Sequence, residues 1–155
     1  MANILAKHKI ETPEAMHDLG LSLGATFKAG DLVLLTGPLG AGKTTLTRGI
    51  GEALGAIGNV SSPTFVIART HKLDGKLAEL GDTVLVHVDA YRLSSAAELD
   101  DLDIDFENSI TIVEWGKGYT DGITDRWLEI EIERDHTGAS ETREVVVTQH
   151  EASDA

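Results

Sequence analysis

The residues best suited to chemistry lie between positions 37 and 44, where glycines lead into a lysine and a threonine. The segment reads Gly-Pro-Leu-Gly-Ala-Gly-Lys-Thr and fits the pattern G-x-x-x-x-G-K-[ST] without a gap. Glycines in such a loop let backbone N–H groups turn toward phosphate oxygens, and Lys43 would reach the β- and γ-phosphates. The Thr44 hydroxyl offers a ligand for Mg²⁺. We therefore predict that a nucleoside triphosphate binds along the loop, at Gly37, Leu39, Gly40, Ala41, Gly42, Lys43, Thr44 and Thr45.

The segments on either side of this loop favour a phosphate site over a chance glycine turn. Residues 32–35 are an apolar run typical of a buried parallel strand. After the loop, Leu46, Ile50 and Leu54 recur at helical spacing, and Gly55 is suited to end that helix. A strand, a glycine loop and a helix therefore follow one another in the order that phosphate binding needs.

Two acidic residues come directly after apolar runs further along the chain. Residues 83–89 predict a central strand that ends at Asp89, and residues 110–113 predict a second strand, followed by Glu114. Ligands of open α/β sheets bind at the carboxyl ends of the strands. We interpret Asp89 as an acid that holds Mg²⁺ or its waters, and Glu114 as a second metal ligand or the group that orients an attacking water. The alternative is that both are ordinary acids at strand ends.

Three further residues, His87, Trp115 and Thr64, each allow a structural and a functional interpretation. His87 lies in the strand that ends at Asp89, and a hydrogen-bonded structural histidine is favoured there over a catalytic one. Trp115 is interpreted as a core or interface residue rather than a cofactor contact. Thr64, in the segment 61–65, is placed where nucleotide switches sense the γ-phosphate, although a simple turn into a strand fits equally well.

The sequence favours ATP over GTP. Residues 71–74 read His-Lys-Leu-Asp, one residue away from the Asn/Thr-Lys-x-Asp pattern that reads guanine. A histidine does not replace the asparagine side chain of that pattern. The sole Asp-x-x-Gly, at residues 135–138, comes in the wrong order along the chain.

The predicted elements define an α/β chain. Thr12 as N-cap and Pro13 at the first helical position start a helix that we expect to reach about residue 27. A strand is expected at 64–68 and a helix followed by a loop at 94–107. Two late strands are expected at 128–132 and 144–147, the first with the alternation of an antiparallel edge strand. The expected architecture is a three-layer P-loop NTPase fold with a mostly parallel central sheet and an antiparallel C-terminal strand pair.

Composition limits the remaining possibilities. A chain of 155 residues fits a single P-loop ATPase domain, expected at 1–149, with 150–155 as a disordered tail. It contains no cysteine, which excludes disulfides and thiolate metal sites. No apolar run has the length of a signal peptide or a membrane span, so we expect no membrane contact and a cytoplasmic location.

Charge is distributed unevenly. Residues 1–92 carry nine Lys/Arg and nine Asp/Glu, whereas residues 93–155 carry four against seventeen, so the whole net charge of −13 arises there. Such a surface repels a phosphate backbone, which argues against tight direct binding of nucleic acid. The acidic surface either serves solubility or meets a basic partner.

Four segments together resemble the TsaE (YjeE) family of tRNA threonylcarbamoyladenosine biosynthesis ATPases. Beyond the loop, the resemblance rests on Val-Ser-Ser-Pro-Thr-Phe at 60–65, His-Val-Asp-Ala-Tyr-Arg-Leu at 87–93 and Val-Glu-Trp at 113–115. Their order is far more specific than the loop alone, which many families share. The match covers most of the chain, and one departure is Gly116-Lys117, where many relatives carry Pro or Ala and then an acid or Gln.

The resemblance implies a function and a set of partners. Members are Mg²⁺-dependent ATPases that join a TsaB–TsaD pair and support modification of the adenosine beside the anticodon in ANN-reading tRNAs, which would contact this chain only through the partners. It implies phosphate binding by Lys43, with Thr44 and Glu114 as Mg²⁺ sites. It also assigns Asp89 to the metal and water, and Thr64 to the switch segment. A contact near the adenine would fall at Thr12 to Pro13, and a late arginine near the nucleotide would be Arg143, with Arg134 as competitor.

Two other functions stay open at this point. A small-molecule or nucleoside kinase would also use a short P-loop domain, but the chain contains no arginine-rich lid and no acceptor-binding insertion. A nucleotide-gated binding module with negligible hydrolysis would share the same motifs. We expect the chain to be a monomer, or to self-associate weakly, when alone.

Overall fold

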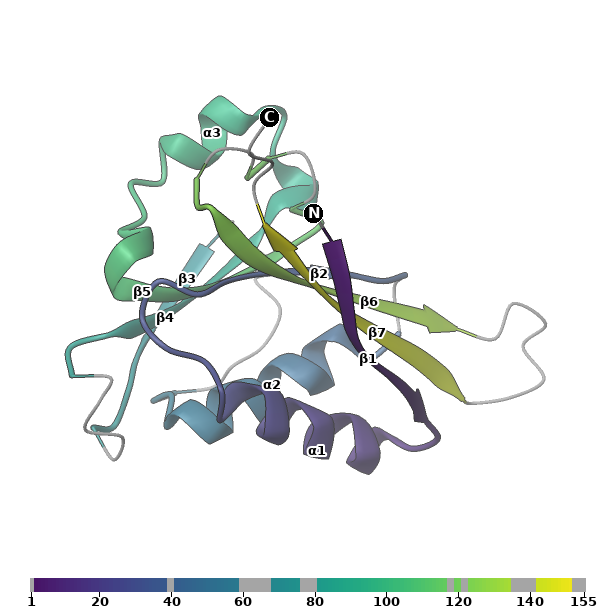
Figure 1. The fold of residues 1–155 in the computed structure, drawn as a ribbon. Helices are drawn as coiled ribbons and strands as arrows, with labels where there is room; N and C mark the ends of the chain where they lie inside the picture. The colour runs from purple at the N-terminus through teal and green to yellow at the C-terminus, as the bar shows by residue number, and fades with distance from the viewer. Residues whose placement is uncertain are drawn as a thin grey trace.

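The computed structural model describes residues 2–38, 41–58, 68–75, 81–116, 119–120, 123–134 and 142–151. These residues form one seven-stranded sheet with helices on both faces (Figure 1). The elements in chain order are β1 (Ala2–Ile10), α1 (Pro13–Gly24), β2 (Leu32–Thr36), α2 (Lys43–Leu54), β3 (Ala68–Lys72), β4 (Val84–Asp89), η2 (Ala90–Arg92), α3 (Ala96–Asp100), η3 (Phe106–Asn108), β5 (Ser109–Glu114), β6 (Arg126–Arg134) and β7 (Arg143–Glu151).

The centre of the sheet is parallel and its margins are antiparallel. The strand order is β1-β7-β6-β2-β5-β4-β3. Strands β6, β2, β5 and β4 run parallel, while β3, β7 and β1 pair antiparallel with their neighbours. The predicted fold class, including the antiparallel C-terminal strand pair, is therefore confirmed. The carboxyl ends of four parallel strands consequently meet at one edge of the sheet.

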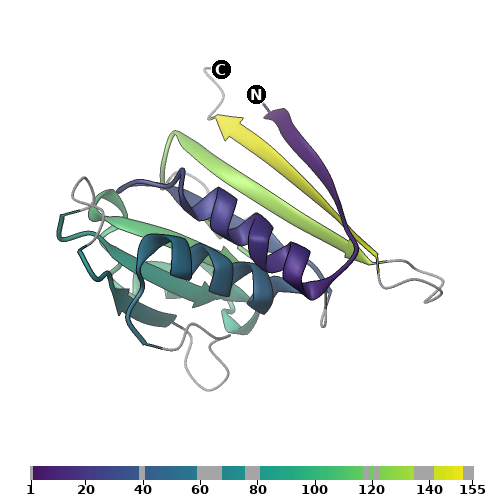
Figure 2. The same cartoon turned by 90° about the horizontal axis from the view of Figure 1, so that it is seen from below.

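Two apolar cores separate the three layers. On one face, α1 and α2 lie side by side across the sheet (Figure 2) and cover a core that includes Leu35, Ile112 and Ile130. On the other face, α3 and the segment around it cover a smaller core that includes Val88 and Leu99.

Glycines let α1 and α2 approach closely. A Cβ at Gly20 would meet the backbone of α2 at the Leu46 carbonyl oxygen, and one at Gly49 would meet the His17 carbonyl oxygen of α1. At Gly24 the added carbon would lie 2.7 Å from the Ile50 carbonyl oxygen. The obstacles are main-chain atoms, which cannot rotate away. The helix that follows the phosphate loop is thus held by backbone-to-backbone packing.

The first helix begins where the sequence predicts and ends earlier. The Thr12 hydroxyl accepts a hydrogen bond from the Ala15 amide at 3.0 Å, and Pro13 occupies the first turn. The helix stops at Gly24, and a turn follows in which the Phe27 amide donates to the Gly24 carbonyl. Phe27 remains buried, which explains why the apolar pattern extended the predicted helix to it.

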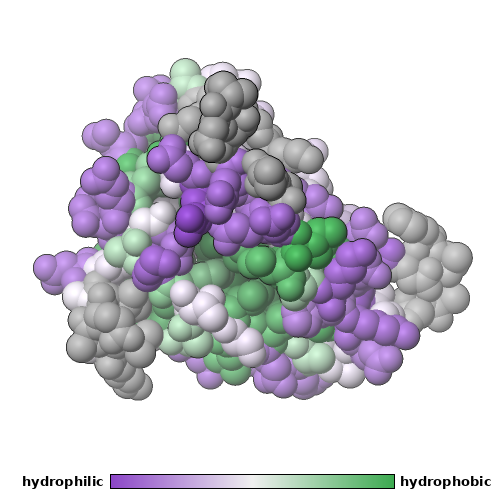
Figure 3. Space-filling view, in the orientation of Figure 1, coloured by the Kyte–Doolittle hydropathy of each residue, from purple (hydrophilic) through white to green (hydrophobic). Residues whose placement is uncertain are grey.

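The expectation that the strand at 128–132 is an edge strand is wrong. Strand β6 lies between β2 and β7. The edge on that side of the sheet is β1, a strand that we did not predict. The alternating acids of β6 have the pattern of a solvent-exposed strand face. Glu129 is nevertheless buried, and its carboxylate lies 2.8 Å from His150 Nε2 of β7. Strand β1 escaped prediction because two of its three large apolar residues, Ile4 and Leu5, are more than half exposed, so it lacks a regular alternation of buried apolar residues. Figure 3 shows a hydrophobic area where β1 begins.

Two other boundaries differ from expectation. The helix followed by a loop expected at 94–107 is present as the short helix α3 and the residues after it, with η3 beginning at the end of this range. Of the strand expected at 64–68, only Ala68 is among the described residues, and it begins β3. Strand β7 continues through Glu151, so two residues expected in the tail pair with β6 instead.

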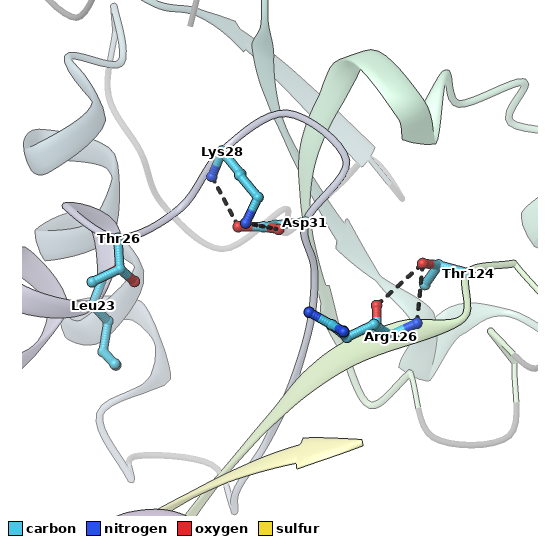
Figure 4. Close-up of polar contacts among 6 residues, drawn as sticks. All are labelled: Leu23, Thr26, Lys28, Asp31, Thr124 and Arg126. Atoms are coloured by element: carbon cyan, nitrogen blue, oxygen red, sulfur yellow. Dashed lines mark hydrogen bonds and ion pairs between the residues drawn. The ribbon is translucent and has the colours of Figure 1, made fainter. Parts of the chain in front are cut away.

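A pocket of about 610 Å³ lies at the amino ends of β2 and β6, far along β2 from the glycine loop. Apolar residues of β1, α1 and β6 line it, among them Leu5, Phe27 and Leu128. Several polar residues that line it form local hydrogen bonds: the Asp31 carboxylate accepts from the Lys28 amide at 2.8 Å, and the Thr124 hydroxyl bonds both the amide and carbonyl of Arg126 (Figure 4). No helix in the described part of the chain has the length and apolar character needed to cross a membrane.

Candidate functional site

The two predicted acids lie side by side where two parallel strands end. Asp89 closes β4, Glu114 closes β5, and the two are direct partners across the strands. On its other side Glu114 pairs with Leu35 of β2, the strand that leads into the glycine loop. Period-two alternation puts both carboxylates on the face that α2 covers. The sheet therefore brings together three segments that are distant in sequence.

Lys43 is the cation at this edge of the sheet. It is the first residue of α2, and its ammonium donates to the Gly37 carbonyl within the loop. Burial lowers the pKa of Lys43 from its ordinary value, while the charges of Glu114 and Asp89 oppose that shift. The ammonium is thus partly desolvated and close to both acids.

The Glu114 carboxylate forms a buried contact with His87. The side chain of Glu114 is 6% exposed and that of His87 is fully buried. Glu114 Oε2 lies 2.8 Å from His87 Nε2. The predicted hydrogen-bonded histidine is present, and its partner is the acid proposed for metal or water.

Asp89 has a more open position than Glu114. It is partly exposed, and its Oδ1 accepts a hydrogen bond from the Tyr91 amide at 3.1 Å, which caps η2. The carboxylate therefore lies at a strand end with one oxygen committed to the backbone.

Trp115 is a site residue that the sequence interpretation missed. Its ring centroid lies 4.7 Å from Lys43 Nζ, and Tyr91 packs against it at 5.9 Å between ring centroids. Its backbone adopts φ 59°, a left-handed conformation that costs energy for a bulky residue. This conformation turns the chain at the end of β5 and puts the indole over the ammonium. An aromatic residue after a strand-end acid was the available signal, but a positive φ is not readable from it.

Gly116 accounts for the departure noted after Trp115. A Cβ there would lie 2.7 Å from Val113 Cγ1 and 2.9 Å from Leu34 Cδ2. The main chain packs directly on the core at this point, which favours glycine. Lys117 lies outside the described residues.

A pocket of about 270 Å³ opens beside the glycine loop. Ala41, Gly42 and Thr45 form its wall on the loop side, and Thr12, Pro13 and Met16 at the start of α1 form the opposite side. Arg143 of β7 lines it as well. Arg134 pairs with Arg143 across the strands but is not part of the lining. The structure therefore assembles the loop, the first helix and the late arginine around one cavity, with Ile10 and Glu11 completing its lining.

The oxygen donors present fit a magnesium ion. Thr44 lies in the first turn of α2, next to Lys43, and Asp89 and Glu114 add carboxylates. Within the described ranges no three His, Cys, Asp or Glu side chains converge into a complete metal site. Mg²⁺ usually takes one or two carboxylates and completes its shell with waters and substrate phosphates, so this donor set is suitable. Leu39, Gly40 and Thr64 lie outside the described residues.

A glycine loop between a parallel strand and a helix, with acids at the ends of neighbouring strands, defines a P-loop NTPase fold. The structure of YdiB from Bacillus subtilis superposes with a TM-score of 0.69 at 29% identity, over 96% of this chain and 86% of that one.

The model of the family "Threonylcarbamoyl adenosine biosynthesis protein TsaE" matches residues 10–145, and the chain belongs to this family. A Streptomyces coelicolor protein named "tRNA threonylcarbamoyladenosine biosynthesis protein TsaE" is 51% identical over 86% of this chain and 89% of its own length. A Bacillus subtilis protein of the same name is 34% identical over 92% of this chain and 84% of its own.

Proposed function

We propose that this chain binds and hydrolyses ATP with Mg²⁺, and that it does so in tRNA threonylcarbamoyladenosine biosynthesis, the process that its relatives are named for. One observation carries the proposal. Lys43, Asp89 and Glu114 converge at the end of the loop strand, directly beside a cavity walled by the loop itself. A phosphate chain and a nucleoside are thus offered adjacent sites.

In the proposed complex, the triphosphate lies along the loop residues from Gly37 to Thr45. Backbone N–H groups and the start of α2 receive phosphate oxygens, and Lys43 exchanges the Gly37 carbonyl for the β- and γ-phosphates. The base and ribose occupy the cavity between Thr12 and Arg143, whose apolar lining suits a purine ring.

Hydrolysis requires a positioned water and stabilisation of the charge on the phosphoryl group. Asp89 or Glu114 orients the water, and Lys43 stays close to the transferred group. Thr44, Asp89 and Glu114 would hold Mg²⁺, which neutralises phosphate charge when bound. Thr64 remains our prediction for the contact through which loss of the γ-phosphate is sensed.

The proposed assembly is with a TsaB–TsaD-type pair, for modification of the adenosine beside the anticodon in ANN-reading tRNAs. The acidic second half of the chain supports an indirect role, since it disfavours contact with the tRNA backbone. The chain alone is proposed to be a monomer or to self-associate weakly. The cytoplasm is the proposed location, because tRNA is modified there.

Phosphate release from ATP by the purified chain tests this proposal. We expect slow release alone and faster release with matching TsaB–TsaD and tRNA. Lys43→Ala should abolish ATP binding, whereas Lys28→Ala, an exposed lysine at the other end of β2, should leave it unchanged.

Three outcomes would count against the proposal. Wild-type ATP affinity in Lys43→Ala would remove the phosphate-loop assignment. Release that ignores the partners would leave the ATPase but not the role in tRNA modification. Transfer of the γ-phosphate to a small acceptor would indicate a kinase instead.

A further inference from the structure

We propose that His87 is a positioning residue, which holds the Glu114 carboxylate in place through its Nε2–H and leaves the second carboxylate oxygen for the metal or water. This inference rests on the proposed function of Glu114. It assigns a task to a buried histidine that the mechanism above does not use.

The geometry excludes a surface role for His87. The residue lies in β4 with 0% of its surface exposed, on the face that α2 covers. Glu114 is a strand-end acid with a nearly buried side chain, and 2.8 Å separates Oε2 from His87 Nε2. A buried carboxylate without a hydrogen-bond partner is costly, so this contact fixes which way the acid points.

The environment of the other ring nitrogen sets the tautomer. His87 Nδ1 is buried and has no hydrogen-bond partner among the described residues. A proton on Nδ1 would leave a buried donor unsatisfied, which is rarer in proteins than an unsatisfied acceptor. A ring with its proton on Nε2 avoids this and donates to Glu114 Oε2. Glu114 Oε1 then remains available to the site that holds Lys43, whose ammonium feels the charge of Glu114.

Hydrogen-bonding partners of metal-binding carboxylates commonly change metal affinity or activity by about 10- to 100-fold when removed. The effect expected here is on the metal-dependent step. Contacts of the nucleotide with the loop backbone and with the cavity between Thr12 and Arg143 do not involve His87.

The decisive experiment compares three substitutions that differ in where they put a donor. His87→Gln places an amide nitrogen near the position of Nε2, His87→Asn places it near Nδ1, and His87→Phe keeps a ring without a donor. The measurements are the Mg²⁺ concentration for half-maximal hydrolysis, ATP affinity in EDTA, and thermal unfolding. We expect His87→Phe and His87→Asn to need roughly tenfold or more Mg²⁺. His87→Gln should recover most of the wild-type value, and ATP affinity in EDTA should be unchanged throughout.

A spectroscopic readout is independent of turnover. Nitrogen-15 NMR of the nucleotide-free protein should show the ring proton of His87 on Nε2, with a shifted Nε2 resonance in Glu114→Gln. A proton on Nδ1 would overturn the inference. Equal Mg²⁺ requirements in folded His87→Gln and His87→Asn would also overturn the inference. The comparison of these two variants tests it even if His87→Phe does not fold.

The inference and the proposed function fail in different ways. If Glu114→Gln leaves the Mg²⁺ requirement and turnover unchanged, the role of Glu114 itself is wrong. If Glu114→Gln is defective while folded His87→Phe is not, only the role of His87 is wrong.

Discussion

At the scale of single residues, Lys43 is the most sensitive reporter of the site. Burial lowers its pKa from the ordinary value of 10.5, so its ammonium deprotonates at a lower pH than that of a solvated lysine. A bound triphosphate would favour the charged form, and binding therefore takes up a proton wherever free Lys43 is neutral. ATP affinity should be highest below the lowered pKa of Lys43 and should fall as the pH rises through it.

Calorimetric titrations of ATP into the protein across the alkaline range would measure this decline. Lys43→Arg is the control, because a guanidinium stays charged over that range and its affinity should vary little with pH. An equally steep decline in Lys43→Arg would show that another group controls the pH dependence.

The lowered pKa of Lys43 also affects the stability of the fold. Below this lowered pKa, Lys43 is charged in both the folded and the unfolded chain, and burial of the charge reduces the free energy of unfolding. That loss of stability disappears as the pH rises from the lowered pKa toward 10.5, where the folded chain holds Lys43 neutral.

The two late arginines offer a matched pair for the nucleoside end of the site. Arg143 lines the cavity beside the loop, whereas Arg134, its partner across β6 and β7, does not. Losing a hydrogen bond from a charged group typically costs about 1.5–3 kcal/mol, so Arg143→Ala should weaken ATP binding by roughly one to two orders of magnitude. Arg134→Ala should bind as the wild type does. The reverse ranking in fluorescence or calorimetric titrations would move the nucleoside away from this cavity.

Residue types indicated which side chains lie at the candidate site but not how they are arranged there. The glycine loop, Lys43 and the two strand-end acids are readable because each belongs to a local pattern, an apolar run followed by a polar residue. Trp115 was not readable, since its place over Lys43 depends on a positive φ that a tryptophan rarely adopts. The partner of His87 depends on the pairing of β4 with β5, which no local pattern contains.

At the scale of elements, the close contact of α1 and α2 at their glycines determines where the glycine loop lies relative to α1. Because an added Cβ at Gly20 or Gly49 meets main-chain atoms, the helices must separate. Overpacking of this kind costs about 1–3 kcal/mol, and the favourable helix propensity of alanine offsets less than that. We expect Gly20→Ala and Gly49→Ala to be destabilised by about 1–2 kcal/mol, measured by urea denaturation.

Ser22→Ala is the matched control, since Ser22 is an exposed position of the same helix and alanine there should be neutral or slightly stabilising. Separation of the helices would also shift Gly42 and Met16, which meet where α1 and the loop approach each other. ATP affinity should therefore fall in the two glycine variants and not in Ser22→Ala. Glycine variants as stable as the wild type would mean that the helices pack less closely than described.

The two strands whose presence or position the sequence did not predict contain residues that are unusual for their position. Strand β1 exposes Ile4 and Leu5 among lysines, as an edge strand tolerates, and so lacks a buried alternating pattern. Strand β6 has the alternation of a wet edge, but its acid Glu129 is buried against His150. In both strands the pairing with distant strands determines which residues are buried, and the pattern within one segment does not contain that information.

At the scale of the whole molecule, the excess negative charge lies in the second half of the chain. All of the net charge of −13 comes from residues 93–155, which include β6, β7 and the segment that covers the second face of the sheet. A cation-lined path for a phosphate backbone would require several lysines or arginines on one face, and this half contains four. The chain alone should therefore bind tRNA weakly even at low ionic strength, where electrostatic attraction is least screened.

Electrophoretic mobility shift with unmodified ANN-reading tRNA, at about 20 mM and 150 mM salt, would measure this, since a Debye length of about 20 Å at the lower salt exaggerates any attraction. We expect no complex from this chain alone at micromolar concentration, with or without ATP, and a complex only when the proposed partner pair is present. Tight binding by the chain alone that weakens steeply with salt would reveal a cationic surface on this chain. It would also replace the indirect role by a direct one. Because Glu114 of β5 and Arg143 of β7 belong both to the proposed nucleotide site and to the acidic half, the sheet proposed to bind ATP would then have to meet the tRNA itself rather than signal to proteins that hold it.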